Sequence, residues 1–173
     1  MQKIIKSIII IIFVFILGIF FLSLNRTTNY NTEYLVGNNI EIIELQSLVG
    51  EKIFVNEDLK KNSFTLINFW ASWCAPCRIE HPILMKLSEK KNLMLLGINF
   101  KDKELQAKTF LSELGNPYDF LAKDKNGKNS VKFGIYGIPE SILINKELVI
   151  IQKFVGPLSV DDFNNIIKII EQL

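Results

Sequence analysis

The chain has few of the residues that build metal centres and disulfide frameworks. Its 173 residues include two cysteines, Cys74 and Cys77, and one histidine, His81. A tetrahedral structural zinc site needs four Cys or His ligands, and only three are available. A disulfide-stapled scaffold needs more than the single bridge that two cysteines allow. We therefore expect the cysteines to form a redox pair, with no metal and no other cofactor.

Charge of one sign is not concentrated anywhere in the chain. Of the 20 basic residues, Lys3 and Lys6 precede an apolar run, and the remaining 18 balance the 18 acidic residues. No basic stripe suits nucleic acid, and no acidic tail suits a solvating or histone-like partner, so we exclude a nucleic-acid-binding function. Apolar residues make up 49% of the chain, which is enough for a core and an appended membrane segment.

The apolar run has no charge within it and no cleavage site after it. Residues 8–24 contain no charge, and counted from Ile4 the run is 21 residues long, or about 30 Å as a helix, enough to cross a bilayer. The sequence after it, SLNRT, lacks the small residues of a signal-peptide cleavage site. A buried core helix would carry polar residues on one face, and this run does not. We therefore expect residues 1–24 to be an uncleaved membrane anchor.

The few charges that flank the anchor predict its orientation. Lys3, Lys6 and the α-amino group outweigh Arg26, which places the N-terminus in the cytoplasm. The polar residues 25–39 are expected to be a tether, followed by one domain over residues 40–173. The predicted topology is thus a single membrane crossing, with the C-terminal domain outside the cytoplasm.

Apolar patterns predict an α/β domain with an opening β-hairpin at residues 40–45 and 52–55. A strand, helix, strand and helix follow, then a minor strand at Phe120–Leu121, two paired strands and a helix that opens on a Ser159-x-x-Asp162 capping box. The main elements are expected at residues 65–70, 75–90, 93–99, 103–114, 141–144, 149–154 and from Ser159 onward.

The two cysteines fall between the first long strand and the helix that follows it. At a helix N-terminus the unpaired amides and the dipole stabilise a thiolate, so Cys74 is expected to have a lowered pKa and to act as the nucleophile. Cys77, one turn on, can attack a mixed disulfide at Cys74. Pro76 in the first turn loses no helical hydrogen bond, and Trp73 would shield the sulfur and offer a flat surface to a partner. The alternatives are an inert structural disulfide or two buried thiols.

Four separated motifs resemble the thioredoxin superfamily and, within it, the cytochrome c maturation oxidoreductases of the CcmG/DsbE family. They are WCAPCRIEHP at 73–82, GINFKD at 97–102, LSELGNPY at 111–118 and YGIPE at 136–140. The resemblance covers most of residues 40–173. It implies a thioredoxin-like fold, in which a central mixed sheet is flanked by helices, here with an N-terminal β-hairpin extension and one transmembrane helix.

Two departures from thioredoxin bear on the chemistry. Where thioredoxin has a buried Asp, this chain has Asn68, so the base that deprotonates Cys77 is expected elsewhere, at Glu80 or Glu140, or in water. A solvated helix face is the alternative for Glu80. No histidine lies between the cysteines, which favours a reductant over an oxidant. His81, outside the motif, is interpreted as a surface histidine.

The family resemblance also implies a partner groove beside the cysteines. Pro139 resembles the superfamily's cis-proline, which leaves backbone groups free to pair with an extended substrate. Tyr136 and Glu140 would border the groove, although packing within the loop is the alternative for both.

The favoured interpretation is a dithiol reductant that reduces apocytochrome c, or the thiol partner that holds it, before haem attachment. Electrons would come from a membrane donor of the DsbD/CcdA type, as the resemblance implies. Two alternatives remain open: a general extracytoplasmic thiol reductase of the TlpA/ResA kind, and a tethered peptide-binding holdase.

Overall fold

The computed structural model of the chain describes residues 2–24, 33–41 and 43–172. The chain divides into two compact units, Met1–Asn31 and Thr32–Leu173. Most of the expected tether, residues 25–32, lies outside the described residues. The first unit contains α1, Gln2–Leu24. Within it, Ile4–Ser23 is long and apolar enough to be a candidate membrane span, with a mean hydropathy of 3.0.

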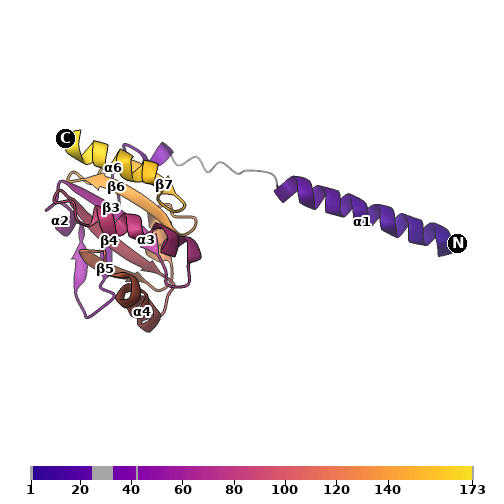
Figure 1. The fold of residues 1–173 in the computed structure, drawn as a ribbon, viewed down its shortest axis with the longest axis horizontal. Helices are drawn as coiled ribbons and strands as arrows, with labels where there is room; N and C mark the ends of the chain where they lie inside the picture. The colour runs from indigo at the N-terminus through magenta and orange to yellow at the C-terminus, as the bar shows by residue number, and fades with distance from the viewer. Residues whose placement is uncertain (1, 25–32, 42, 173) are drawn as a thin grey trace. The chain divides into compact units, whose positions relative to one another are not determined.

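The second unit is built on a five-stranded mixed sheet with the order β5-β4-β3-β6-β7 (Figure 1). β3 pairs in parallel with β4, and β4 with β5, whereas β6 is antiparallel to β3 and β7. A separate hairpin of β1 and β2 precedes the sheet. The strands are β1 (Glu44–Gln46), β2 (Ile53–Val55), β3 (Phe64–Trp70), β4 (Leu93–Phe100), β5 (Phe120–Asp124), β6 (Glu140–Asn145) and β7 (Ile150–Val155).

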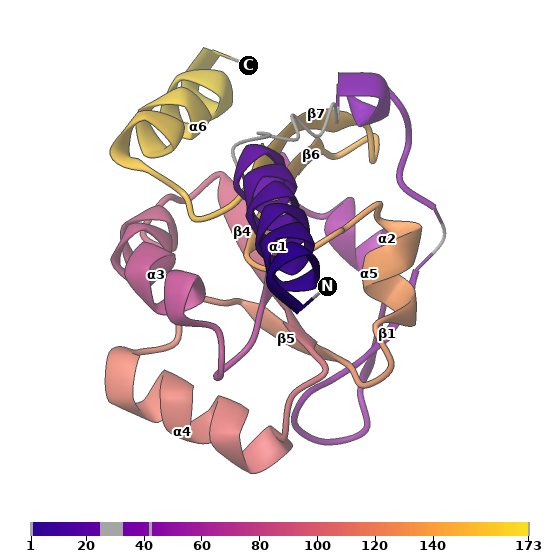
Figure 2. The ribbon, with the colours of Figure 1, turned by 90° about the vertical axis from the view of Figure 1, so that its right-hand side faces the viewer.

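Helices cover both faces of the sheet. One face carries α3, α4 and α6, and the other carries α2, α5 and the hairpin (Figure 2). Because side chains alternate along a strand, Leu66 of β3 packs into the first layer and Ile67 into the second. All seven residues of β3 are buried. The helices of this unit are η1 (Glu33–Leu35), α2 (Asn56–Leu59), α3 (Ala75–Leu87), α4 (Glu104–Leu114), α5 (Lys128–Lys132) and α6 (Val160–Gln172).

The order of the main strands and helices predicted from the apolar pattern is confirmed, but one strand is longer than expected and two short helices were not predicted. The edge strand β5 has five residues rather than the expected two, because its pairing with β4 extends to Asp124. The short helices α2 and α5 were not predicted, since four or five residues are too few to show a helical period. The capping box is present: Ser159 N–H donates to Asp162 Oδ2 and Asp162 N–H to Ser159 Oγ.

Residues 33–39 were expected to belong to the tether, but they pack on the domain. Gly37 N–H donates to Ile150 O over 2.8 Å, and Asn39 forms a β-bridge with Val149. These contacts use the outer side of β7, which is otherwise the unpaired edge of the sheet. The compact unit therefore begins before residue 40.

Candidate functional site

The two cysteines lie where β3 ends and α3 begins. Cys74 is the N-cap residue of α3, and its Sγ accepts a hydrogen bond from Cys77 N–H over 3.2 Å. The sulfurs are joined in a disulfide, with a Cα–Cα distance of 5.3 Å, so the structure represents the oxidised protein. The expected strand, CxxC and helix arrangement is thus present.

The surroundings of Cys74 suit a negatively charged sulfur once the disulfide is reduced. The first turn of α3 contains no acidic residue, and the N–H of Cys77 in that turn points at Cys74 Sγ. Pro76 stands in that first turn, where its missing N–H leaves no gap in the helix. Both cysteines are buried, at 4% exposure for Cys74 and 2% for Cys77, so burial alone does not distinguish attacker from resolver.

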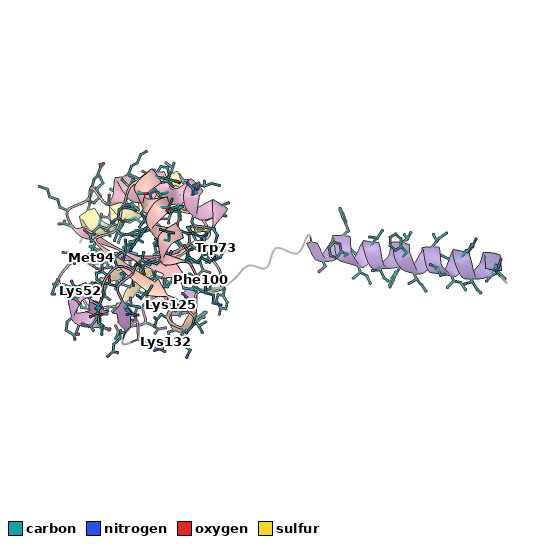
Figure 3. All side chains as sticks on the ribbon, turned by 90° about the horizontal axis from the view of Figure 1, so that it is seen from below. Lys52, Trp73, Met94, Phe100, Lys125 and Lys132 are labelled. Atoms are coloured by element: carbon teal, nitrogen blue, oxygen red, sulfur yellow. A yellow bond between two sulfur atoms is a disulfide. The ribbon has the colours of Figure 1, made fainter. Side chains whose placement is uncertain are left out.

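Trp73 lies at the surface beside the disulfide (Figure 3). Its ring is 58% exposed, and its Nε1–H donates to the carbonyl of Lys101. The preceding residue, Ser72, is bound by Asp102, because its N–H and hydroxyl both donate to the Asp102 carboxylate, over 2.6 and 2.9 Å. The loop before the cysteines is therefore fixed by Asp102. The sequence placed Asp102 in a matching motif without assigning it a function.

Glu80 lies one helical turn after Cys77 and is completely buried. Its Oε1 accepts from Asn68 Nδ2 over 2.9 Å, and its Oε2 accepts from Leu158 N–H over 2.8 Å. Burial raises the pKa of this carboxyl to about 7, and the two hydrogen bonds only partly oppose that effect. The solvated helix face considered for Glu80 is thus not what the structure has.

The amide of Asn68 connects Glu80 to a buried tyrosine. Asn68 Oδ1 accepts from the hydroxyl of Tyr118 over 2.7 Å, and Nδ2 also donates to Ser141 Oγ over 3.0 Å. Burial and the neighbouring Glu80 raise the pKa of Tyr118 well above its usual value, so it remains a donor. Gly97 permits this arrangement, because a Cβ there would lie 2.8 Å from the Tyr118 ring. Tyr118 and Ser141 are site residues that the sequence did not identify.

The partner loop, residues 134–139, ends in the cis peptide bond between Ile138 and Pro139, as expected from the resemblance. Pro139 is buried, and its carbonyl accepts from Gly156 N–H over 3.0 Å. Within the described part of the chain, the N–H and C=O of Ile138 make no hydrogen bond. An extended peptide could pair with these two groups, as in the addition of a strand to a sheet edge.

Tyr136 and Glu140 differ in the way they meet this loop. Tyr136 is 65% exposed and can touch a partner, and its hydroxyl lies 3.4 Å from that of Tyr34. Glu140 is only 2% exposed, because its side chain turns under the loop and forms an ion pair with Lys153 over 2.8 Å. This differs from the expectation that Glu140 borders the groove, and it agrees with the alternative of packing within the loop.

His81 was interpreted as a surface residue, and that interpretation is wrong. The residue is 3% exposed, its Nε2 lies 3.0 Å from the carbonyl of Gly115, and its ring meets Phe110 edge-on. Burial lowers the pKa of the imidazole. Among the residues that the structure describes, no group of three or more His, Cys, Asp or Glu side chains is placed to hold a metal ion.

Comparison with known proteins identifies a set of relatives. A model of the family Redoxin matches residues 36–170. The thiol:disulfide interchange protein HelX of Rhodobacter capsulatus is 39% identical over 127 residues, which cover 73% of this chain and 72% of HelX. The thiol:disulfide interchange protein DsbE of Pseudomonas fluorescens is 38% identical over 122 residues, which cover 70% of this chain and 67% of that protein.

Solved structures share the fold. A Chlorobium tepidum protein, described as a thiol:disulfide interchange protein DsbE, superimposes with a TM-score of 0.68 at 26% identity, covering 79% of this chain and 96% of that one. A DsbF homologue from Corynebacterium diphtheriae gives a TM-score of 0.67 at 24% identity, covering 78% and 86%, and it shows the fold alone. The thioredoxin-like fold predicted from the sequence is confirmed.

Proposed function

This chain belongs to the Redoxin family and, within it, to the DsbE family of thiol:disulfide interchange proteins, and from that premise we propose that it is a membrane-anchored dithiol reductant of cytochrome c maturation. The observation that supports this most is the placement of the cysteine pair. It caps α3, with a buried carboxyl one turn beyond it and unpaired backbone groups at Ile138 in the described part of the chain.

The proposed reaction transfers two electrons from the cysteine pair to a disulfide of the partner. The thiolate of reduced Cys74 attacks one partner sulfur, a mixed disulfide forms, and the other partner sulfur leaves as a thiolate that takes up a proton. Cys77 then loses its proton and attacks Cys74 Sγ. The partner leaves with both cysteines reduced, and the Cys74–Cys77 disulfide seen in the structure is the product.

Glu80 is the group proposed to receive the proton of Cys77. It lies on the same buried side of α3, three residues further along, and its pKa of about 7 lets it exchange a proton near neutral pH. Asn68 donates a hydrogen bond to it and cannot itself take the proton. Glu140, the other candidate, is already paired with Lys153 beneath the partner loop.

A reducing direction is proposed because no histidine stands between the cysteines to stabilise the thiolate strongly. The potential should lie nearer that of thioredoxin, about −270 mV, than that of a strong oxidant, about −120 mV. Outside the cytoplasm the pair needs a continuous supply of electrons, so a membrane donor of the DsbD/CcdA type is part of the proposal. The partner would be apocytochrome c, at its haem-binding motif, or the thiol protein that holds it.

The proposed location follows from α1 and its flanking lysines. α1 would span the bacterial inner membrane once, with the Thr32–Leu173 unit on the periplasmic side. Such an anchor would keep the reductant beside a membrane donor.

The test is to delete the gene, measure covalently bound c-type haem, and restore either the wild type or Cys74→Ser. We expect c-type cytochromes to be lost, to return with the wild type but not with Cys74→Ser, and to return in part when an external thiol is added. Normal c-type cytochromes in the deletion strain would refute the pathway and favour a general TlpA/ResA-like reductase. Full rescue by the Cys74→Ser, Cys77→Ser double variant would instead indicate a holdase.

A further inference from the structure

Two opposite charges are buried together at the end of the sheet beneath the partner loop. The side chains of Glu140, on β6, and Lys153, on β7, are 3% and 0% exposed, and their charged atoms lie 2.8 Å apart. Lys153 pairs with Ile142, two residues from Glu140, so the two charges are diagonal neighbours on one face of the sheet. Apolar residues of similar size usually fill such a space at equal or lower free energy. Stability alone therefore gives no reason for the pair.

The remaining polar contacts of the pair go to the partner loop. Glu140 Oε1 accepts from the backbone N–H groups of Tyr136 and Gly137, over 3.0 and 2.9 Å. Lys153 Nζ donates to the carbonyl of Gly134 and lies 5.5 Å from the centre of the Tyr136 ring. The two charges thus hold three backbone groups and approach one aromatic ring, all within four consecutive residues of the loop.

These contacts determine which side of the loop faces outward. The N–H groups of Tyr136 and Gly137 turn inward to Glu140, while the ring of Tyr136 stays exposed. The next residue, Ile138, directly precedes the cis-proline and keeps its N–H and C=O unpaired in the described part of the chain. An extended chain that pairs with Ile138 needs these groups in a fixed direction, because a main-chain hydrogen bond weakens steeply when misaligned.

We propose that Lys153 is a positioning residue for partner binding, which acts through Glu140 and the carbonyl of Gly134 to hold the partner loop in the conformation that receives an extended, cysteine-containing polypeptide. The proposal rests on the proposed function in so far as the partner is a polypeptide disulfide. Lys153 touches neither the reacting sulfurs nor the partner. Its effect should therefore appear in binding and not in the chemistry of the cysteines.

The test compares two kinds of substrate with the full-length protein in detergent micelles. One is an oxidised peptide of about 12 residues with a Cys-x-x-Cys-His segment, and a second peptide has the same composition and cysteine spacing in scrambled order. The other kind is the small aromatic disulfide 5,5′-dithiobis(2-nitrobenzoate), which needs the cysteine pair but no peptide-binding loop. Wild type is compared with Lys153→Met, which keeps the aliphatic stem, Lys153→Arg, which keeps the charge, and Lys146→Met, the same change at a 65% exposed lysine.

We expect Lys153→Met to raise the KM for the peptides about tenfold, the effect of losing one or two aligned hydrogen bonds, with little change in kcat. The small disulfide should be reduced within about twofold of the wild-type rate. Lys153→Arg should recover part of the peptide KM, and Lys146→Met should match the wild type on every substrate. Because the loop binds backbone, both peptides should respond alike to Lys153→Met.

The charge left behind on Glu140 could unfold Lys153→Met, so the double variant Glu140→Gln, Lys153→Met is measured as well. It has no lone buried charge and should show the same rise in peptide KM. A peptide KM within about twofold of wild type in a folded variant would overturn the proposal. The proposal would also be overturned if Lys153→Met and the double variant each lost activity equally on the peptides and on the small disulfide. If the wild type shows no preference between the two peptides, that result would count against cytochrome c as the partner. The effect of Lys153→Met on KM could still be measured with either peptide.

Discussion

Replacement of the buried carboxyl by an amide, Glu80→Gln, should change how the stability of the domain depends on pH. The carboxyl has a pKa of about 7 in the folded protein and 4.5 as its ordinary value. The folded state therefore holds a proton that the unfolded chain has already lost between these pH values. Stability contributed by the protonated carboxyl is fully present below pH 4.5 and is lost as the pH rises through 7.

The size of this effect follows from the difference in pKa. A raise from 4.5 to about 7 corresponds to a loss of about 3 kcal/mol in the free energy of unfolding between the two pH values. The amide that Glu80→Gln introduces does not titrate, so the substitution removes this pH dependence. It also places an amide NH₂ against either Asn68 Nδ2 or Leu158 N–H, which both donate to Glu80, and this mismatch costs about 1–3 kcal/mol at every pH.

The measurement is urea unfolding of the oxidised Thr32–Leu173 unit at pH 5, 6, 7 and 8. The wild type should lose stability relative to Glu80→Gln across this range, so the difference between the two curves should shrink or change sign as the pH rises. Parallel curves would refute the reasoning, because they would mean that Glu80 titrates in the folded protein as it does in the unfolded chain. Glu89→Gln, at an exposed position on the surface, serves as the control.

Three further predictions concern the residues around the cysteines and the anchor. Tyr118→Phe leaves Asn68 Oδ1 without its donor, so we expect the urea midpoint to fall by the equivalent of about 1–3 kcal/mol, whereas Tyr34→Phe at the surface should not change it. In the reduced protein, Cys74 should have a pKa below about 8.5, and iodoacetamide at mildly acidic pH should modify it before Cys77; equal labelling would contradict the helix-terminus argument. Mass spectrometry of the mature protein should find an N-terminus at Met1 or Gln2, and a start near Asn25 would contradict an uncleaved anchor.

The sequence predicts the central elements well because their signals are local. β3 and β4 are nearly continuous apolar runs, and a strand followed by CxxC and a helix is recognisable within a single short stretch of chain. The environment of Glu80 is not local: its carboxyl is held by Leu158, 78 residues away. From the sequence alone, a glutamate on a helix is as easily interpreted as solvated until that contact is known. His81 was misjudged for the same reason. Its ring contacts Phe110 of α4 and the carbonyl of Gly115 at the end of that helix.

The loop of Glu140 illustrates a second limit. The motif YGIPE predicts a cis-proline and neighbours beside the partner, and the structure has the cis bond. The motif does not show which neighbours of the proline face outward. That depends on Lys153, which lies on the next strand and carries no signal of its own among 20 basic residues. Pairing between strands, rather than any pattern within one, turns Glu140 inward.

The central sheet divides the site into two compartments. Asn68, Glu80 and Tyr118 gather on the face covered by α3 and α6, whereas Glu140 and Lys153 lie on the opposite face, with the second core layer. Among the described residues, no side-chain hydrogen bond joins the first three to the ion pair. The residues that set partner choice and those that set proton transfer can therefore change separately during evolution. An engineer could exchange the loop and its ion pair for those of a relative and leave Asn68, Glu80 and Tyr118, and so the proton chemistry beside the cysteines, unchanged.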